Sequence, residues 1–428
     1  MFIVTTAQTR KIEARLPGPI RIVASVLVIA GCLGLIFFSA TIGFSRLLGR
    51  YGVLSTSLPA TNEALRLAPS DPEAHRAQAA VFRNLKMYRE AAKELEVAIS
   101  LRPSDDYLWL ELGVVRDELE DPQGALRAFD RAVAQAPYYA HTRWQRANVR
   151  LRVGRYEEAF AELRAAATSN RGYLLTLIDL AWSLSKGDAK VTEQLAGIND
   201  TADRIAFARF LARKGKGKET VEQFRLVKSQ ISEEYKRELI RELVYFGAYP
   251  EAYEIWSGTE PHQTVVMYDG GFEGTINFGE DGFGWNFPRD LSKVKVSVDT
   301  SDKDSGEKSI RIVFDGNSNA GAAVFSQLLI VNPKQQYRIN FASKGKEIVS
   351  GGLPLLSVAN AQTNVTFASS STLPQNSTSW EKRSIDFTTP DACHAIVLKL
   401  VRTGCQSNPC PVFGVLWLDS FSIEEIHD

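Results

Sequence analysis

Residues 106–137 read DYLWLELGVVRDELEDPQGALRAFDRAVAQAP, and the pattern of this stretch recurs along the chain. The positions that define it are Trp109, Leu112, Gly113, Ala125, Phe129, Ala132 and Pro137. The last four match Ala91, Leu95, Ala98 and Pro103 one period earlier, and Ala159, Leu163 and Ala166 follow one period later. A fixed period of about 34 residues predicts a repeated structural unit that stacks on its neighbours.

The spacing within one unit indicates two antiparallel helices. Small residues such as Gly113 and Ala125 let helix backbones approach closely, while Phe129 fills the space between them. Pro103 and Pro137 end the second helix of successive units, because proline cannot donate the helical hydrogen bond. The residues on both sides match the pattern less completely. We predict five or six units over residues 55–258.

This combination of period and residue types resembles the tetratricopeptide repeat. The resemblance implies an α-solenoid whose groove binds a protein partner. Nothing of comparable strength suggests catalysis, since the sequence has no glycine-rich phosphate loop, no Gly-x-Ser-x-Gly and no His-Glu-x-x-His. We therefore expect a protein that holds partners and is not an enzyme.

The composition limits the classes of partner. Lys and Arg total 50, Asp and Glu total 50, and the net charge of the 428-residue chain is zero. Nucleic-acid binding is accompanied by a basic surplus, so we expect no nucleic-acid partner. The length suffices for two or three domains of roughly 100–200 residues.

An apolar run without charge, IVASVLVIAGCLGLIFFSATIGF, covers residues 22–44. It is long enough to cross a bilayer of about 30 Å, and a cleaved signal peptide is the alternative. Four basic residues precede the run with Glu13 as the acid among them, so the positive-inside rule favours a cytoplasmic tail at residues 1–21. We expect a single-pass membrane protein whose bulk, after Tyr51, is periplasmic or extracellular.

Two of the four cysteines, Cys405 and Cys410, flank a short Gln-Ser-Asn-Pro loop. We expect a local disulfide between them, which fits an oxidising compartment; two free thiols are the alternative. Cys32 lies within the apolar run, where it serves as an apolar residue. A metal site at these cysteines is not expected, because none of the five histidines falls at ligand spacing from them.

Beyond residue 265 the helical period gives way to short alternating segments. The clearest are 294–298, 309–314, 336–341, 383–387 and 395–400, each bounded by Gly, Asn, Ser, Asp or Pro. Alternation of this kind predicts strands with one buried face, and their number predicts an antiparallel β-sandwich of the jelly-roll type over residues 265–426.

Six short motifs give this segment a second resemblance. In order they are DGGFE at 269–273, GW at 284–285, SGEKSI at 305–310, YRINF at 337–341, SWEKRS at 379–384 and LDSFSI at 418–423. Together they resemble the carbohydrate-binding β-sandwich modules appended to xylanases and related glycanases. The resemblance implies a possible polysaccharide ligand, although a shared fold does not fix the ligand.

Individual residues carry alternative roles within that resemblance. Trp417 and Trp285 are the rings chosen to stack on a sugar, with packing in the core as the alternative for both. Glu273 and Asp419 occupy positions where the family often holds a structural calcium ion. Calcium takes six to eight oxygen ligands, so backbone carbonyls from the 302–308 turn would have to contribute. The family's next acid after Asp419 is Ser420 here, which departs from the pattern.

The leading hypothesis is a membrane-anchored extracytoplasmic scaffold. Its repeats would bind a protein partner and its sandwich a glycan, as suits the assembly or export of surface polysaccharide. The alternative is a protein–protein assembly factor whose sandwich binds no sugar. No cofactor is required under either hypothesis, apart from the structural calcium.

Overall fold

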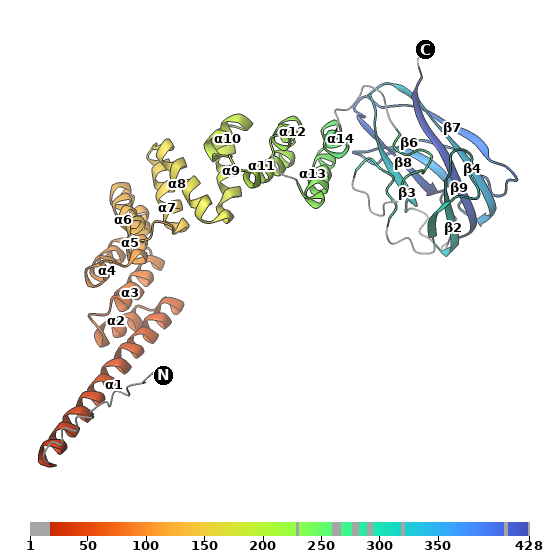
Figure 1. The fold of residues 1–428 in the computed structure, drawn as a ribbon. Helices are drawn as coiled ribbons and strands as arrows, with labels where there is room; N and C mark the ends of the chain where they lie inside the picture. Colours follow the sequence, from red (N-terminus) through yellow and green to blue (C-terminus); the bar gives the residue numbers. More distant parts are fainter. Residues whose placement is uncertain are drawn as a thin grey trace, which may run out of the picture. The chain divides into compact units, whose positions relative to one another are not determined.

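The computed structural model describes residues 18–227, 231–258, 267–275, 282–288, 294–317, 322–405 and 410–426. Helices come first and strands follow (Figure 1). The helices are α1 (Gly18–Ser55), α2 (Leu58–Leu67), α3 (Pro72–Asn84), α4 (Tyr88–Leu101), α5 (Asp106–Glu118), α6 (Pro122–Gln135), α7 (Ala140–Arg152), α8 (Tyr156–Ser169), a short 3-10 turn η1 (Arg171–Tyr173), α9 (Leu174–Leu184), α10 (Ala189–Ala196), α11 (Thr201–Arg213), α12 (Gly217–Arg225), α13 (Glu233–Tyr245) and α14 (Tyr249–Ser257). The chain divides into two compact units, the first ending at Leu177 and the second beginning at Ile178.

The repeat predicted from the sequence is confirmed by where the helices begin. First helices start at Pro72, Asp106 and Ala140, and second helices at Tyr88, Pro122 and Tyr156, so both series advance by one repeat period at each step. The starts follow local capping chemistry: the carboxylates of Asp71, Asp105 and Asp121 accept backbone N–H groups of the first turns of α3, α5 and α6. Later helices continue as hairpins with less regular spacing.

Close packing between the two helices of a unit explains the small residues of the pattern. The Phe129 ring on α6 is buried, and it lies against Gly113 on α5. A Cβ atom added at Gly113 would stand 2.6 Å from the Phe129 ring carbons. Glycine at this position therefore makes room for the ring.

Helix α1 carries the apolar run and continues beyond it. Its stretch Ile20–Ser55 is long and apolar enough to cross a membrane, a test that a membrane span and a signal sequence both pass. Its last turns belong to the repeats: Ser45 Oγ donates 2.7 Å to the Ala64 carbonyl, and Arg46 pairs with Asp71 at 2.8 Å. Of the expected cytoplasmic tail, residues 1–17 lie outside the described residues.

The C-terminal strands form two antiparallel sheets. One has the order β1 (Val294–Asp299), β2 (Ser309–Asn317), β9 (Pro411–Glu425), β4 (Gln336–Ser350), β7 (Glu381–Thr388); the other has β3 (Phe325–Ile330), β8 (Ala395–Arg402), β5 (Pro354–Asn360), β6 (Thr366–Ser369). All five segments chosen for their alternation lie in strands. Buried residues of both sheets share one hydrophobic core, among them Ile312 and Leu416 of the first and Phe325 and Leu398 of the second.

The second compact unit contains helices and strands together. The reason is a shared apolar cluster, in which Leu243 and Ile255 of α13 and α14 join Phe283, Leu328 and Ile330. The sequence pattern predicts the change of secondary structure, and the division into domains at residues 55–258 and 265–426 stays a prediction.

Candidate functional site

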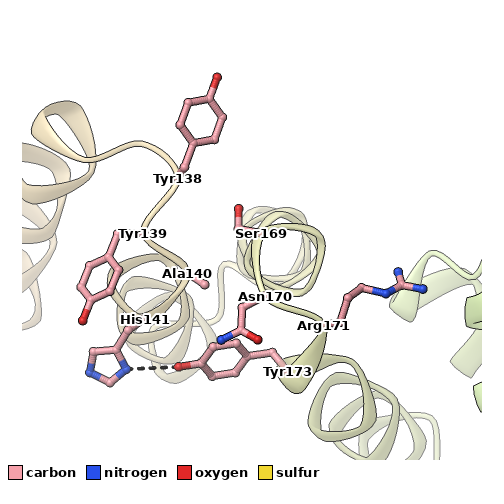
Figure 2. Close-up of a pocket in the computed structure, with 8 residues that line it drawn as sticks. All are labelled: Tyr138, Tyr139, Ala140, His141, Ser169, Asn170, Arg171 and Tyr173. Carbon is pink, nitrogen blue, oxygen red and sulfur yellow. Dashed lines mark hydrogen bonds between the residues drawn. The ribbon is translucent and has the colours of Figure 1, made fainter.

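One hollow of the repeats lies where the connections before α7 and α9 come together. It has a cavity volume of about 770 Å³. Its lining consists of Tyr138, Tyr139, Ala140, His141, Ser169, Asn170, Arg171 and Tyr173 (Figure 2). We call this set the tyrosine pocket; all of it belongs to the first compact unit.

Local chain geometry places these side chains. Helix α6 ends before Pro137, and the connection to α7 carries Tyr138 and Tyr139 into solvent, with 85% and 44% of their surfaces exposed. On the other side Asn170 ends α8, and its side chain accepts the Gly172 N–H at 2.9 Å, which turns the chain toward Tyr173. Two connections one repeat apart thus face the same hollow.

Three rings of the pocket form a continuous series of contacts that ends on Trp144. Tyr139 and His141 have ring centroids 6.2 Å apart, His141 Nδ1 lies 3.3 Å from the Tyr173 hydroxyl, and Tyr173 stacks on Trp144 at 4.8 Å. Figure 2 shows the Tyr138 ring standing apart from Tyr139, His141 and Tyr173. We call Tyr139, His141, Tyr173 and Trp144 the aromatic ladder. These contacts link three rings of the pocket to one another and to Trp144.

The arginines of α7 do not make the pocket cationic, because carboxylates of neighbouring helices pair with them. Arg146 contacts Asp130 at 2.8 Å and Glu162 at 2.6 Å, and Arg143 reaches Glu162 at 3.1 Å. Burial alone would raise the pKa of Glu162, but the hydrogen bond and charge of Arg146 outweigh it, and the pKa is lowered. The lining itself combines aromatic and polar side chains with one guanidinium, that of Arg171.

A half-buried acid, Glu111, lies on α5 of the preceding repeat. Burial raises the pKa of Glu111 to about 7, against the opposing charges of Arg76 and Arg83. Within the described residues its Oε2 accepts no hydrogen bond, and the nearest ion-pair contact, Arg76 Nη1 to Oε1, is 3.6 Å long. Arg76 instead contacts Glu73 at 2.9 Å and lies over the Tyr107 ring. Glu111 is thus a weakly satisfied carboxylate.

The two tryptophans chosen for sugar stacking lie in different settings. Trp285 is buried among Phe272, Phe325 and Phe421, and its Nε1 donates to the Asp269 carbonyl at 2.8 Å, so this ring packs in the core. Trp417 alternates with the core residues Leu416 and Leu418, which turns its side chain to the other face of the sheet.

Trp417 nevertheless offers little surface to a ligand. Only 8% of the residue is exposed, its Nε1 donates to Asp299, and Arg311 and Lys344 lie 5.8 Å and 6.0 Å from the ring centroid. The cations flank it from β2 and β4, the neighbouring strands. A sugar would have to displace these side chains before it reached the ring.

Glu273 and Asp419 do come together, at the 302–308 loop. Asp419 Oδ2 accepts the N–H groups of Asp304 and Ser305, and Glu273 Oε1 accepts those of Glu307 and Lys308, at 2.7–3.2 Å. Each of these two carboxylate oxygens accepts two backbone N–H groups, whose positive dipole ends point at it. The Lys308 ammonium donates a hydrogen bond to the backbone carbonyl of Glu273. Among the described residues no group of three or more His, Cys, Asp or Glu suits a metal ion. Backbone N–H groups of the loop thus occupy lone pairs of both carboxylates, and the calcium site stays a prediction.

Cys405 and Cys410 form a disulfide, with Cα atoms 5.9 Å apart. Arg402 Nη2 donates to the Cys410 carbonyl at 2.9 Å and thereby ties the end of β8 to the start of β9. The residues between the cysteines, 406–409, lie outside the described part of the chain. Cys393 is a buried free thiol and Cys32 is a free thiol on α1.

The tyrosine pocket escaped the sequence analysis, which selected residues by their fit to the packing pattern. A signal was nevertheless present: Tyr139 and Tyr173 stand one full period apart, and neither is a core position of the repeat. Aromatic residues at a constant non-core position indicate a surface that recurs from unit to unit.

Comparisons with known proteins give limited matches. No family model matches the chain. Protein FlbA of Caulobacter vibrioides is 34% identical over 105 residues, which is 24% of this chain and 18% of that protein. The chain thus spans under a fifth of the length of this relative.

Solved structures similar to the chain include YrrB, a TPR protein with an unusual peptide-binding site, and MamA. YrrB is 23% identical, with a TM-score of 0.31, over 36% of this chain and 84% of its own. MamA is 14% identical, with a TM-score of 0.33, over 45% of this chain and 99% of its own. The repeat assignment rests on the helix spacing and packing of the chain itself.

Proposed function

We propose that this chain is a scaffold whose helical repeats bind an extended segment of a protein partner at the tyrosine pocket. The observation that carries the proposal is a hollow rimmed by exposed tyrosines on stacked helical hairpins. Repeat proteins present extended surfaces of this kind, and tyrosine combines large contact area with a hydrogen-bonding tip. The chain acts in this proposal by association, without catalysis.

The proposal includes attachment to a membrane through α1. The contacts of Ser45 and Arg46 with α2 and Asp71 support an uncleaved span, because cleavage after the apolar run would sever the helix that these residues belong to. The basic residues before the run support a cytoplasmic N-terminus. The Cys405–Cys410 disulfide supports a periplasmic or extracellular location for the bulk of the chain.

For the C-terminal sheets we propose a jelly-roll β-sandwich that serves protein assembly. The two sheets with one common core support this topology. The setting of Trp285 and Trp417 favours the alternative without sugar binding, since one ring is buried and the other is flanked by cations. A role with surface polysaccharide would need a different sugar-binding surface.

Selection from a random peptide library tests the scaffold proposal directly. The full chain in detergent micelles serves as bait, and each enriched peptide is measured against the variants Tyr138→Ala and Tyr139→Ala. Tyr156→Ala is the matched control, because Tyr156 on α8 is 55% exposed and lies outside the pocket. We expect enriched peptides that lose affinity for the pocket variants and keep it for the control.

The opposite results would overturn the proposal. A library that yields no peptide sensitive to Tyr138 or Tyr139 removes the pocket as a partner site. A reporter fused after Asp428 tests the topology: activity on the exported side is expected, and activity in the cytoplasm would refute the extracytoplasmic assignment.

A further inference from the structure

The pocket surfaces combine flat apolar faces with polar tips. Three tyrosines and one histidine contribute the faces. Ser169 and Asn170 add further polar groups, Arg171 adds a guanidinium, and Ala140 is the aliphatic member of the set. No acidic side chain is among the lining residues. A matching ligand offers the apolar faces of saturated rings to the aromatic side chains. It also offers carbonyl oxygens without internal hydrogen bonds to the hydroxyl and amide donors.

Two other modes of peptide recognition fit less well. An amphipathic helix anchors aliphatic side chains in an apolar groove, and this pocket has almost no aliphatic lining. Strand addition needs free backbone groups, but the N–H groups of Tyr139 and Tyr173 already donate to Ala136 and Asn170 at 3.2 Å and 3.1 Å. Recognition must therefore come from side chains.

We propose that the tyrosine pocket accepts a proline-rich segment in the polyproline II conformation, an inference that rests on the proposed function and specifies its ligand. Polyproline II has no internal hydrogen bonds, so its carbonyls are free to accept from Tyr hydroxyls and the Asn170 amide. Its proline rings stack on aromatic faces, and its stiffness keeps the entropic cost of binding low.

The aromatic ladder matches this stiffness on the side of the protein. Tyr173 is held between the Trp144 ring at 4.8 Å and His141 Nδ1 at 3.3 Å, and His141 in turn adjoins Tyr139. Rings fixed by such contacts lose little rotamer freedom when a ligand arrives. Binding of a stiff ligand to rings that are already packed on one another costs little conformational entropy on either side.

Fluorescence anisotropy with a labelled decaproline peptide tests the inference on the full chain in detergent micelles. A flexible Gly-Ser peptide and an Ala-rich helical peptide of the same length are the comparison probes. We expect decaproline to bind and the two comparison peptides to bind at least about tenfold more weakly.

Four variants refine the result. Tyr138→Ala and Tyr139→Ala are expected to weaken decaproline binding by about tenfold, the usual loss for one aromatic contact, while Tyr156→Ala stays within about twofold. Tyr173→Phe keeps the stack on Trp144 and loses the hydroxyl near His141, so we expect an intermediate loss. Since Tyr138 is 85% exposed, Tyr138→Ala leaves the fold intact, which circular dichroism verifies.

The possible outcomes distinguish the proline-rich ligand from the proposed scaffold function. Pocket-dependent library peptides without proline, together with no decaproline binding, overturn the inference and leave the scaffold function standing. Absence of any pocket-dependent peptide overturns both. Decaproline binding that Tyr156→Ala weakens as much as Tyr139→Ala does would also overturn the inference, because the peptide would then bind elsewhere.

Discussion

The indole Nε1 of Trp417 donates a hydrogen bond of 2.9 Å to Oδ2 of Asp299, two strands away in the same sheet. Burial would raise the pKa of Asp299, but hydrogen bonds from Ser301 and Trp417 outweigh it and lower the pKa to about 2. The ring and the carboxylate thus hold β9 and β1 together across β2. This bond makes Trp417 a structural residue of the sheet face.

Asp299→Asn is expected to destabilise the sheets in a pH-dependent manner. A carboxylate whose pKa falls from 3.8 to about 2 on folding stabilises the fold above pH 4 by about 2 kcal/mol. This contribution is lost as the pH falls from about 4 to about 2. Melting followed by tryptophan fluorescence should show a gap between variant and parent at pH 6 that closes near pH 2. Asp315→Asn, at an exposed site on β2, is the control, and a gap independent of pH would contradict the assignment.

Gly113→Ala is expected to loosen the α5–α6 hairpin, because its Cβ would stand 2.6 Å from the Phe129 ring. Overpacking of this kind costs about 1–3 kcal/mol. Phe129→Leu leaves space beside Gly113, so the double variant should lose less than the sum of the two single losses. Amide hydrogen exchange of α5 and α6 in the full chain measures all three. Strict additivity would show that the two residues do not share this space.

Glu111→Gln is expected to stabilise the protein at neutral pH. An acid whose pKa rises from 4.5 to about 7 on folding binds more protons in the folded state, so stability falls as the pH rises through this interval. The variant should gain about 2–3 kcal/mol over the parent at pH 8 and nothing at pH 4. Glu118→Gln on the same helix is the control, because Glu118 pairs with Arg83 at 2.8 Å. Equal melting temperatures of Glu111→Gln and parent at pH 8 would contradict the burial of an ionised carboxylate.

Millimolar calcium added to chelator-treated protein is expected to leave the melting temperature of the sheets unchanged. The oxygens of Glu273 and Asp419 already accept backbone N–H groups from the 302–308 loop. Glu273→Gln weakens two of these charge-assisted bonds and should lower the melting temperature with or without calcium. A rise of several degrees with calcium in the parent, absent in the variant, would establish the metal site after all.

The elements that the sequence predicted are those fixed by short-range periodicity. The constant step between helix starts follows from spaced small residues, prolines and aspartate caps, and the strands follow from alternation such as that of Ile310 and Ile312. The packing of Phe283 and Leu328 against α13 and α14 was not predicted, because it is a contact between distant residues. No local pattern encodes such a contact.

The candidate site was harder to predict for a related reason. Tyr138 and Tyr139 occupy a connection, where neither period imposes a pattern, and their meeting with Tyr173 depends on the stacking of successive hairpins. Trp417 shows the converse. Alternation with Leu416 and Leu418 turns the Trp417 ring to the other face of the sheet, but the cations beside it come from Arg311 and Lys344 on other strands. Strand pairing decides whether such a ring is open to a ligand.

The continuity of α1 into the first hairpin has a consequence for which partners can be captured. In the proposed membrane-bound form, the span and the tyrosine pocket belong to one compact unit, and the helix joins them without a flexible hinge between Phe44 and Ser55. The distance from the lipid to the pocket would then be limited by this helix and the hairpins that follow it. A membrane-tethered partner reaches it when its own tether has a matching length, since effective concentration falls steeply for tethers that are too short and gradually for those that are too long. In the proposed membrane-bound form, partners would therefore be selected by the length of their tether as well as by their sequence.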